Sequence, residues 1–386
     1  MKTITPVLLD GVRTPFGRFR GALREVDTRD LLATAISALV ERQPALSTCD
    51  GVLLGQVLQA GHGQNPARLA AAAADIPWTV PAATLNNVCL AGLATASDAS
   101  RRIQLGEGKA YIVGGGDSMS RAAHAAVLRG GVKQGSAELV DTMIVDGLQD
   151  GLTGEGMGEL SERANRALGI TRAAQDAIAV RSHQCAAAAT DEGRLDEEIV
   201  ETDGLKVDEG IRPSSSPEAL AGLPPAFGRD GTITAGNASQ MSDGATVGAV
   251  TSLDEADHMG VAPLVTLMAS AEVAGPDNTL HLKPAAAIRA VCERGGIGLS
   301  ELDLIEINEA FAGVVAASVD DLGVPLDIVN VNGGAIALGH PLGGTGLRLL
   351  LTLARELSRR QGRYGVAALC GGGGQGLAVL VKRIGS

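Results

Sequence analysis

Aromatic residues are scarce in this sequence: Phe, Trp and Tyr together make up 2% of the 386 residues. Large aromatic side chains therefore cannot dominate the interior, which must be built mainly from Ala, Val, Leu and Ile. The apolar fraction of 45% is still enough to fill a sizeable core, and the length allows two or three domain-sized units. The 52 glycines, many of them in clusters, mark tight turns and places where backbones approach closely.

Basic residues are outnumbered as well. The chain has 32 Lys and Arg against 44 Asp and Glu, which gives a formal net charge of −12. Binding to nucleic acid or to an anionic membrane surface usually requires clustered Lys and Arg. The composition therefore argues against both kinds of partner, although a local basic pocket can still hold a phosphorylated ligand.

Features of export and of membrane insertion are also missing. The first residues, M-K-T-I-T-P-V-L-L-D, lead directly into a β-rich run without a signal peptide, so we expect a cytoplasmic protein. Residues 364–381 carry no charge, but their run of four glycines would break a spanning helix. We expect a strand, a tight turn and a second strand there, and no membrane span.

Cysteine spacing gives no sign of a zinc knuckle, because no C-x-x-C pair occurs. In a long chain without an export signal, scattered cysteines favour free thiols over disulfides, and we expect no metal. Any one of them, taken alone, is more often a buried structural thiol than a nucleophile. The five cysteines are Cys49, Cys89, Cys185, Cys292 and Cys370.

Short apolar runs alternate with longer segments rich in Ala and Leu, which is typical of α/β architecture. This alternation predicts strands at 7–9, 51–54, 110–113, 304–307, 327–331 and 365–369. It predicts helices at 28–40, 67–74, 90–105, 173–192, 284–294 and 345–360.

Two stretches of the chain look alike at this coarse level. In each, a loop leads into a helix, a short turn, a strand and a glycine cluster; the first loop carries Cys89 and the second carries His340. A duplicated α/β half-molecule is the economical interpretation, although convergent β-loop-α-β patterning can produce the same picture. The stretch between them has mixed charge and many loop residues, and it looks inserted. We therefore predict an N-terminal half at 1–117 plus 242–262, an inserted loop domain at 118–241 and a C-terminal half at 263–386.

Cys89 lies in N-N-V-C-L-A-G-L, where a loop is expected to become a helix. Unpaired backbone N–H groups and the helix dipole at such a position favour thiolate, the form of cysteine that acts as a nucleophile. The small neighbours Ala91 and Gly92 leave room for an acyl group. Whether Cys89 is a nucleophile or a structural thiol therefore depends on its partners elsewhere in the chain.

Three further segments supply such partners. His340 lies on a glycine-rich loop, G-G-A-I-A-L-G-H-P-L-G-G-T-G, where an imidazole can act as a general base. Cys370 ends an apolar strand before G-G-G-G-Q-G, whose N–H groups can approach a ligand or a developing oxyanion. Asn308 in I-N-E-A-F-A can orient a water, or simply cap a helix. The run has no G-K-[ST] and no G-x-G-x-x-G that opens a helix, so a nucleotide-binding loop is not indicated.

Together and in this order, the four segments resemble the signature blocks of the thiolase family. Three more blocks resemble the same family: T-A-G-N-A-S-Q-M-S-D-G-A, G-V-R-T-P-F-G-R-F and G-G-G-D-S-M-S. The resemblance spans residues 5–382, which is essentially the whole chain. In the insertion, A-A-V-L-R-G-G-V-K-Q-G and V-D-T-M-I-V-D-G-L are most similar to the tetramerisation and substrate-covering loop of the biosynthetic acetyl-CoA acetyltransferases.

This resemblance implies an α/β fold of duplicated halves in a five-layer α-β-α-β-α arrangement, with an inserted loop domain. It implies a homo-oligomer, either a dimer or a tetramer, that needs no cofactor because coenzyme A thioesters are its substrates. The implied reaction is reversible condensation of two acetyl-CoA to acetoacetyl-CoA and CoA. In reverse it is thiolytic cleavage of acetoacetyl-CoA or another 3-ketoacyl-CoA, with ping-pong kinetics through an acyl-Cys89 intermediate.

The same resemblance implies a role for each candidate residue. Cys89 is the acyl-accepting nucleophile, His340 the base that activates it, and Cys370 the acid/base of the second half-reaction. One oxyanion site is assigned to His340 with a water held by Asn308. The other is assigned to the backbone N–H groups of Cys89 and Gly372. The expected contacts with coenzyme A are Ser239, Arg212 and Met157.

Several positions depart from the family pattern. Leu90 and Ala91 follow the nucleophile where many relatives carry smaller or hydroxyl-bearing residues. Gly156 stands where biosynthetic relatives often carry His, and a smaller residue there can widen the acyl pocket. Two enzyme alternatives therefore stay open: a degradative 3-ketoacyl-CoA thiolase of broader chain length, and a decarboxylating ketoacyl synthase, which would not need Cys370. The alternative of another class is a catalytically silent protein on this fold that binds CoA or lipid.

Overall fold

One mixed β-sheet runs through the computed structural model, which describes residues 4–385. Its strands follow the order β10-β11-β12-β9-β1-β8-β5-β3-β4, and the short strand β2 pairs with β8. The strands are β1 (Pro6–Arg13), β2 (Gly17–Arg18), β3 (Gly51–Gly55), β4 (Ala82–Leu85), β5 (Ala110–Ser118), β8 (Ser242–Ser252), β9 (Val265–Ala274), β10 (Leu304–Ile307), β11 (Tyr364–Gly371) and β12 (Gln375–Arg383).

Each half of the sheet places its strands in the same relative order. In the N-terminal half, β8 lies between β1 and β5 and is antiparallel to both, while β3 is parallel to β5 and β4. In the C-terminal half, β12 lies between β9 and β11 and is antiparallel to both, while β10 is parallel to β11. Val7 and Leu8 of β1 pair with Thr266 and Val265 of β9, so the sheet is continuous from one half to the other.

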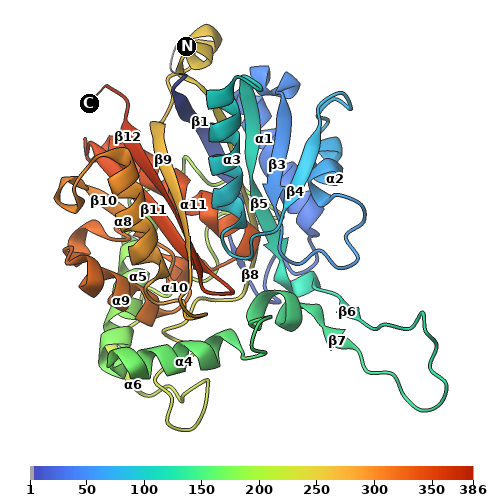
Figure 1. Cartoon of the computed structure of the whole chain (residues 1–386), viewed down its shortest axis with the longest axis vertical. Coiled ribbons are helices and arrows are strands. Elements are labelled where there is room, and N and C mark those ends of the chain that lie inside the picture. The colour runs from blue at the N-terminus through green and yellow to red at the C-terminus, as the bar shows by residue number, and fades with distance from the viewer. Residues whose placement is uncertain (1–3, 386) are drawn as a thin grey trace.

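Helices cover both faces of this sheet (Figure 1). In β1, Val7 and Leu9 pack into the core that contains α1, whereas Leu8 packs into the core that contains α3 and α11. Alternate residues of a strand point to opposite faces, so α1 lies on one side of the N-terminal half and α3 with α11 on the other. The helices in contact with the sheet are α1 (Thr28–Arg42), α2 (Pro66–Ala73), α3 (Ala91–Leu105), α7 (Leu253–Met259), α8 (Lys283–Gly295) and α11 (Leu342–Arg359), and α9 (Ala312–Leu322) packs on α8.

Helices α3 and α11 pack tightly against each other and contact strands of both halves. Glycine makes their approach possible. A Cβ at Gly92 would lie 2.4 Å from the carbonyl oxygen of Gly343, and a Cβ at Gly346 would lie 2.5 Å from the backbone nitrogen of Leu93. Because the loops before α3 and α11 carry two of the candidate residues, this close helix pair brings those loops to the same end of the sheet.

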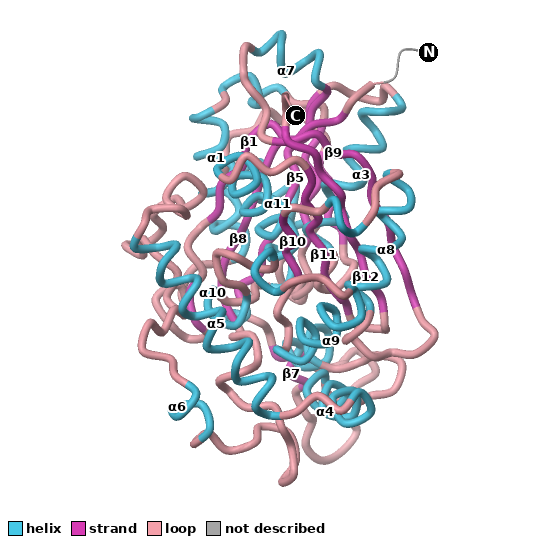
Figure 2. Tube along the Cα trace, turned by 90° about the vertical axis from the view of Figure 1, so that its left-hand side faces the viewer, coloured by secondary structure: helices cyan, strands magenta, loops and turns pink. Residues whose placement is uncertain are grey.

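Residues 118–241 form a loop-rich region below the sheet in the view of Figure 2. Its helices are α4 (Met157–Leu168), α5 (Arg172–Asp191) and α6 (Pro217–Ala221), and the short helix α10 (Ala335–Leu338) from the C-terminal half packs on α5. Within residues 4–385, a helix with the length and hydrophobicity of a membrane span is absent.

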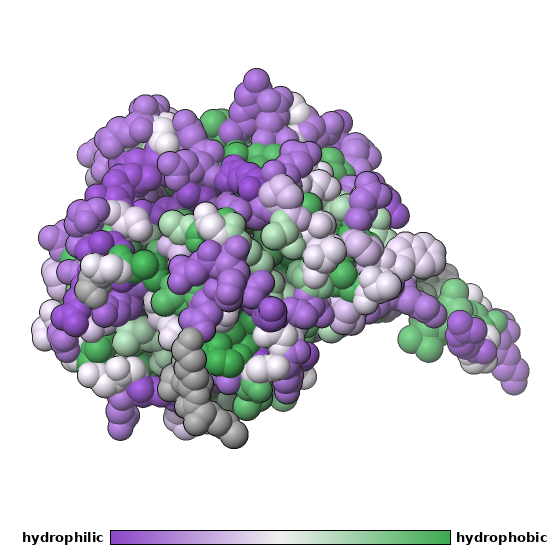
Figure 3. Space-filling model, turned by 90° about the horizontal axis from the view of Figure 1, so that it is seen from above, coloured by the Kyte–Doolittle hydropathy of each residue, from purple (hydrophilic) through white to green (hydrophobic). Residues whose placement is uncertain are grey.

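A narrow arm projects from this region (Figures 1 and 3). Its base is the two-stranded pairing of β6 (His124–Ala125) with β7 (Val140–Asp141). Apolar side chains along the arm face solvent, among them Val127 at 99% exposure and Leu139 at 65%. Exposed apolar residues that gather on one segment usually mark a surface for another protein.

Most of the predicted elements are confirmed with small shifts of their ends, and residues 364–381 do form a strand, a turn and a second strand. The strand predicted at 327–331 is wrong. Residues 326–328 form a short 3-10 turn, and only Val329 makes a β-bridge, to Ile305. Pro325 has no N–H to donate, and Asn330 adopts a left-handed backbone with φ 47°, so regular pairing is interrupted on both sides.

We predict that the free energy of unfolding falls in acid, because the fold buries two histidines. His183 in α5 and His281 before α8 are at most 1% exposed, and burial lowers the pKa of each to about 4. The unfolded chain takes up protons at these sites below about pH 6.5, whereas the folded chain does so only near pH 4. Stability should therefore fall as pH drops through this window, by about 2 kcal/mol per histidine between pH 7 and pH 5.

Urea denaturation at pH 7 and pH 5 tests this expectation. The variant His281→Gln removes one titrating group, so its free energy of unfolding should change less between the two pH values than that of the wild type. Equal losses in the two proteins would show that His281 does not contribute.

Candidate active site

A small cavity of about 60 Å³ brings together most of the residues that the sequence singles out. Cys89, His340 and Cys370 all line it, although they come from the loop before α3, the loop before α11 and the end of β11. Gly372, Met157 and Ser239 line it as well. The remaining lining residues are Val88, Gly147, Leu148, Leu280, Ala310, Phe311, Leu342 and Gly371.

The backbone before the nucleophile candidate is strained. Val88 has φ 49°, a left-handed conformation that a β-branched residue rarely adopts. The Asn86 side chain accepts a hydrogen bond from the backbone N–H of Val88 at 3.0 Å, which helps to hold this turn. Strain of this kind costs on the order of 1–3 kcal/mol and persists where the surrounding structure enforces it, commonly at functional sites. The turn presents Cys89 to the cavity.

Leu90 and Ala91, in contrast, do not line the cavity. Leu90 is 1% exposed and packs beneath Gly371, where a Cβ would lie 2.8 Å from Leu90 Cγ. Ala91 is fully buried and packs against Gly55 of β3. The larger residue at position 90 therefore fills the space under the end of β11, and neither departure changes the lining of the cavity.

The expectation that the helix start lowers the pKa of Cys89 is wrong for the resting site. The thiol is partly accessible from the cavity, but burial among protein atoms raises its pKa to about 12. The backbone N–H groups of Leu90 and Ala91 donate to the carbonyls of Asn87 and Val88, so they do not point freely at the sulfur. Desolvation is the largest contribution to this shift, and Cys89 rests as a neutral thiol that needs a base.

His340 has the geometry of that base. Its Nδ1 lies 2.7 Å from Thr345 Oγ1, and this hydroxyl donates its own proton to the carbonyl of Pro341 at 2.8 Å. The hydroxyl must therefore accept at Nδ1, which assigns the ring proton to Nδ1 and leaves Nε2 unprotonated, with a lone pair that can accept a proton. Burial, with a smaller contribution from the positive charge of Arg348, lowers the pKa of His340 to about 3. The imidazole is neutral at physiological pH.

Asn308 lies beside Nε2 of the imidazole and does not line the cavity. It is fully buried, and its Nδ2 is 3.3 Å from His340 Nε2. Its Oδ1 has no hydrogen-bond partner within the described part of the chain, which makes it available to a water molecule. Asn330 fixes the adjacent strand end, because its side chain bonds both the N–H and the carbonyl of Ile307 at 2.8 Å.

Cys370 is buried at the end of β11, and burial followed by the proximity of Cys89 raises the pKa of its thiol. The glycines that follow it make the turn into β12. Gly374 has φ 69°, and a Cβ there would lie 2.0 Å from the carbonyl oxygen of Asp277, so only glycine fits. The backbone N–H groups of Gly372 and Cys89 donate to no carbonyl or carboxylate between residues 4 and 385, so both are available to an oxyanion.

A larger cavity of about 640 Å³ adjoins the small one and shares His340, Met157 and Ser239 with it. One wall of this larger cavity is the segment from Ala226 to Met241. The other residues of its lining include Met119, Ile144, Leu148, Gly156, Gly158, Glu159, Ala310 and Phe311. Its apolar walls and its connection to the thiols suit an extended ligand that carries a reactive group at one end.

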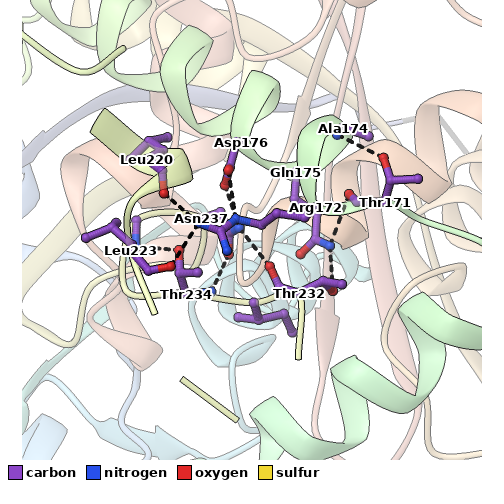
Figure 4. A network of polar contacts seen from close by, with 12 residues as sticks. Thr171, Arg172, Ala174, Gln175, Asp176, Leu220, Leu223, Thr232, Thr234 and Asn237 are labelled. Atoms are coloured by element: carbon purple, nitrogen blue, oxygen red, sulfur yellow. Dashed lines mark hydrogen bonds and ion pairs between the residues drawn. The ribbon is translucent and has the colours of Figure 1, made fainter. Parts of the chain in front are cut away.

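A polar network holds this wall against α5 (Figure 4). Arg172 donates to Asp176 at 2.7 Å, and Asp176 accepts from the side chain of Asn237 at 2.8 Å. Asn237 in turn accepts from the backbone N–H of Thr234 at 2.8 Å, and Gln175 donates to Thr232 Oγ1 at 2.8 Å. The segment that carries Ser239 is therefore anchored before any ligand arrives.

Arg212 lies apart from the other predicted site residues. Its side chain is exposed and belongs to the lining of neither cavity, while its backbone N–H donates to His183 Nδ1 at 3.1 Å. Between residues 4 and 385, no group of three or more His, Cys, Asp or Glu side chains is arranged to hold a metal ion.

Sequence reasoning missed two residues that hold the site together. Thr345 stands inside the His340 motif, and a hydroxyl five residues after a candidate base was the available signal. Asp117 stands at the end of β5, where its carboxylate accepts from the backbone N–H groups of Leu58 at 2.9 Å and Gly343 at 2.7 Å. Burial raises the pKa of Asp117 to about 7, and its hydrogen bonds tie the start of α11 to the loop after β3.

Family models account for nearly all of the described structure. Residues 6–253 match the model of the thiolase N-terminal domain, and residues 261–383 match that of the thiolase C-terminal domain. The chain belongs to the thiolase family. Cys89 and Ser239 fall in the N-terminal thiolase domain, and Asn308, His340 and Cys370 fall in the C-terminal one.

Other thiolases resemble this one along their whole length. A protein of Mycobacterium leprae named "Probable acetyl-CoA acetyltransferase" is 46% identical over 391 residues, covering 98% of this chain and 100% of the relative. The acetyl-CoA acetyltransferase of Shinella zoogloeoides is 42% identical over 387 residues, covering 98% and 99%. The crystal structure of the Bacillus anthracis acetyl-CoA acetyltransferase superposes with a TM-score of 0.95 at 36% identity, covering 99% of each chain.

Proposed function

We propose that this thiolase is an acetyl-CoA acetyltransferase, which condenses two acetyl-CoA to acetoacetyl-CoA and CoA and also cleaves the product in reverse. The observation that carries the proposal is the meeting of two thiols and a neutral imidazole in one small cavity. The adjoining cavity of about 640 Å³ offers room for the long pantetheine arm of a CoA thioester. Relatives named acetyl-CoA acetyltransferase at 42% to 46% identity support the choice of substrate.

The first half-reaction acylates Cys89. Its thiol attacks the carbonyl carbon of acetyl-CoA while its proton passes to Nε2 of His340. The oxyanion receives hydrogen bonds from the backbone N–H groups of Cys89 and Gly372. The C–S bond to CoA then breaks, and the leaving thiolate takes a proton from Cys370. The site now holds acetyl-Cys89, an imidazolium at His340 and a thiolate at Cys370.

The second half-reaction forms the carbon–carbon bond. The Cys370 thiolate removes a proton from the methyl carbon of a second acetyl-CoA. The enolate oxygen is stabilised by the imidazolium of His340 and by a water held on Asn308. The enolate carbon attacks acetyl-Cys89 and releases acetoacetyl-CoA. The Cys89 thiolate then recovers its proton from His340, which restores the resting site.

Coenzyme A contacts are proposed for Ser239, Met157 and Arg212. Ser239 and Met157 line both cavities and so lie where the thioester end of the pantetheine would pass. Arg212 is exposed outside these linings, so its proposed role is limited to the adenine and phosphate end of the ligand. The chemistry needs neither a metal nor a redox cofactor.

Mass spectrometry of the intact protein after mixing with acetyl-CoA tests the proposal. We expect a single added acetyl group on Cys89. Absence of any acyl-enzyme would favour the alternative of a silent protein that binds CoA or lipid. A decarboxylating ketoacyl synthase is less consistent with the position of Cys370 in the cavity wall, because that chemistry does not need a second thiol.

Chain-length preference separates the biosynthetic assignment from a degradative 3-ketoacyl-CoA thiolase. Gly156 lines the larger cavity, at the position where biosynthetic relatives often carry His. Thiolysis rates should be compared between acetoacetyl-CoA and a series of longer 3-ketoacyl-CoA substrates. Faster cleavage of the longer chains would replace the biosynthetic assignment with the degradative one.

Gly158→Ala should weaken substrate binding. A Cβ at Gly158 would lie 2.2 Å from the ring of Phe227, which lines the larger cavity, so the ring must move. We expect KM for acetyl-CoA to rise about tenfold, equivalent to about 1.4 kcal/mol, with a smaller change in kcat. Gly222→Ala is the matched control, because a Cβ there has only one neighbour, 3.9 Å away. Unchanged KM in Gly158→Ala would separate this wall from substrate binding.

We also propose three domains: an N-terminal half at 1–117 plus 242–262, an inserted loop domain at 118–241 and a C-terminal half at 263–386. Pairing of β8 with β1 and β5 supports returning residues 242–252 to the N-terminal half. The shared strand order of the two halves, with α3 and α11 between them, supports a duplicated fold in five α-β-α-β-α layers.

We further propose a cytoplasmic homo-oligomer, either a dimer or a tetramer, in which the exposed apolar arm at 124–141 contacts another subunit. Light scattering of wild type against an arm deletion tests the assembly.

A further inference from the structure

A buried ion pair joins the strand that leads to Asn308 with the helix that holds His340. Arg348 in α11 donates from Nη1 to Glu306 Oε2 in β10 at 2.9 Å, and the two side chains are 0% and 3% exposed. Glu306 precedes Asn308 by two residues in the chain. Arg348 lies one helical turn after Thr345, the hydroxyl that accepts from the His340 ring. The pair thus bridges the two supports of the candidate site.

Stability alone does not explain such a pair. Removing two charges from water is costly, and buried ion pairs can often be replaced by apolar residues without loss of stability. Arg348 is also incompletely satisfied, because its Nε and Nη2 have no hydrogen-bond partner in the described part of the chain. A cation that is expensive to bury and poorly paired is better explained by an effect on its neighbours.

Among the charged groups around the pair, Arg348 is the cation that acts on the pKa of the His340 imidazole. Burial first, and Arg348 second, lower the pKa of His340. Around the pair, Glu309 follows β10 and Glu198 follows α5, and both act on Glu306 through their charge. Glu198 is itself neutralised by Arg13 of β1, at 2.8 Å. Burial raises the pKa of Glu306 and the adjacent charge of Arg348 lowers it, so each member of the pair depends on the other to stay charged.

We propose that Glu306 and Arg348 are positioning residues for the acylation of Cys89, holding Asn308 and His340 in a fixed relation at Nε2, the atom that accepts the Cys89 proton. This inference rests on the proposed function. Neither residue lines the small or the larger cavity, so neither touches the substrate. Their effect must therefore pass through His340 and Asn308.

A double-mutant cycle tests this route. The rate of Cys89 acetylation is measured in single-turnover experiments by mass spectrometry for Arg348→Met, for His340→Asn and for the double variant. We expect Arg348→Met to slow acetylation about tenfold with little change in KM, and to cause no further loss when His340 is already replaced. Arg348→Lys can still pair with Glu306 and should recover most of the rate. The same tenfold loss in both backgrounds would overturn the proposal.

Two further variants keep the test independent of folding. Glu306→Leu combined with Arg348→Met replaces the pair by apolar side chains, and it should remain folded while showing the slow acetylation of Arg348→Met. If this variant does not fold, the pair is assigned to stability and the proposal is overturned. Arg355→Met is the matched control. Arg355 lies in the same helix, but it pairs with Asp10 at 3.0 Å and not with a residue near the cavity. Its acetylation rate should stay within about twofold of wild type.

The wild type separates this inference from the proposed function. If wild-type protein forms no acetyl-Cys89, the proposed function fails. If it does, and the effects of Arg348→Met and His340→Asn simply multiply, only the positioning role fails.

Discussion

Cys370→Ala will still form acetyl-Cys89 from acetyl-CoA but will release acetoacetyl-CoA far more slowly than the wild type. The Cys370 thiol lines the cavity beside Cys89, where it is placed to take the α-proton of the second substrate. Loss of such an acid/base group typically costs 10² to 10⁴ in rate, so condensation should fall by about 10³-fold or more. Acetylation is measured by mass spectrometry of the intact protein, and condensation by the appearance of acetoacetyl-CoA.

Cys185→Ala provides the control for this variant. Cys185 is a partly exposed thiol in α5 and does not line the cavity, so its loss should leave both half-reactions unchanged. Condensation that survives in Cys370→Ala would remove Cys370 from the mechanism and reopen the ketoacyl synthase alternative.

His340→Asn will slow the acetylation of Cys89 itself. Because the pKa of the Cys89 thiol is raised to about 12, very little thiolate is present at neutral pH without a base. Nε2 of His340 is the acceptor that the site provides, and its ring is fixed by Thr345. We expect a loss of about 10³-fold in the single-turnover rate of acetylation at pH 7.

The appropriate comparison for this variant is His258→Asn. His258 lies in α7 and is 78% exposed, so its replacement should leave acetylation unaffected. An acetylation rate near that of wild type in His340→Asn would mean that another group accepts the proton, and the proposed base would be withdrawn.

The sequence predicts which residues meet, because glycine marks the places where the backbone must turn or approach closely. Cys89 and His340 each precede a helix, and glycines at the crossing of α3 and α11 bring the two loops together. Cys370 ends a strand before a glycine turn that only small residues can form. These constraints are local, so they can be predicted from a single sequence.

The pKa shifts and the directions of the side chains could not be predicted from the sequence in the same way. The helix start before α3 suggested a lowered thiol pKa at Cys89, but the pKa depends on desolvation by residues brought from distant parts of the chain. Leu90 departs from the family pattern beside the nucleophile, but the sequence does not show that its side chain packs under Gly371. Glu306 and Arg348 are 42 positions apart in the sequence, so no local sequence pattern predicts their ion pair.

The central position of β1 in the sheet sets the order in which this chain can fold during synthesis. β1 (Pro6–Arg13) is made among the first residues, yet its two neighbours are β8 (Ser242–Ser252) and β9 (Val265–Ala274). At a translation rate of about 5 to 20 residues per second, β1 waits on the order of 10 to 50 s before either partner leaves the ribosome. An unpaired apolar strand exposed for that long can pair with other chains. Shielding of the nascent N-terminus by chaperones should therefore matter more for this protein than for one of equal size whose first strands pair with each other.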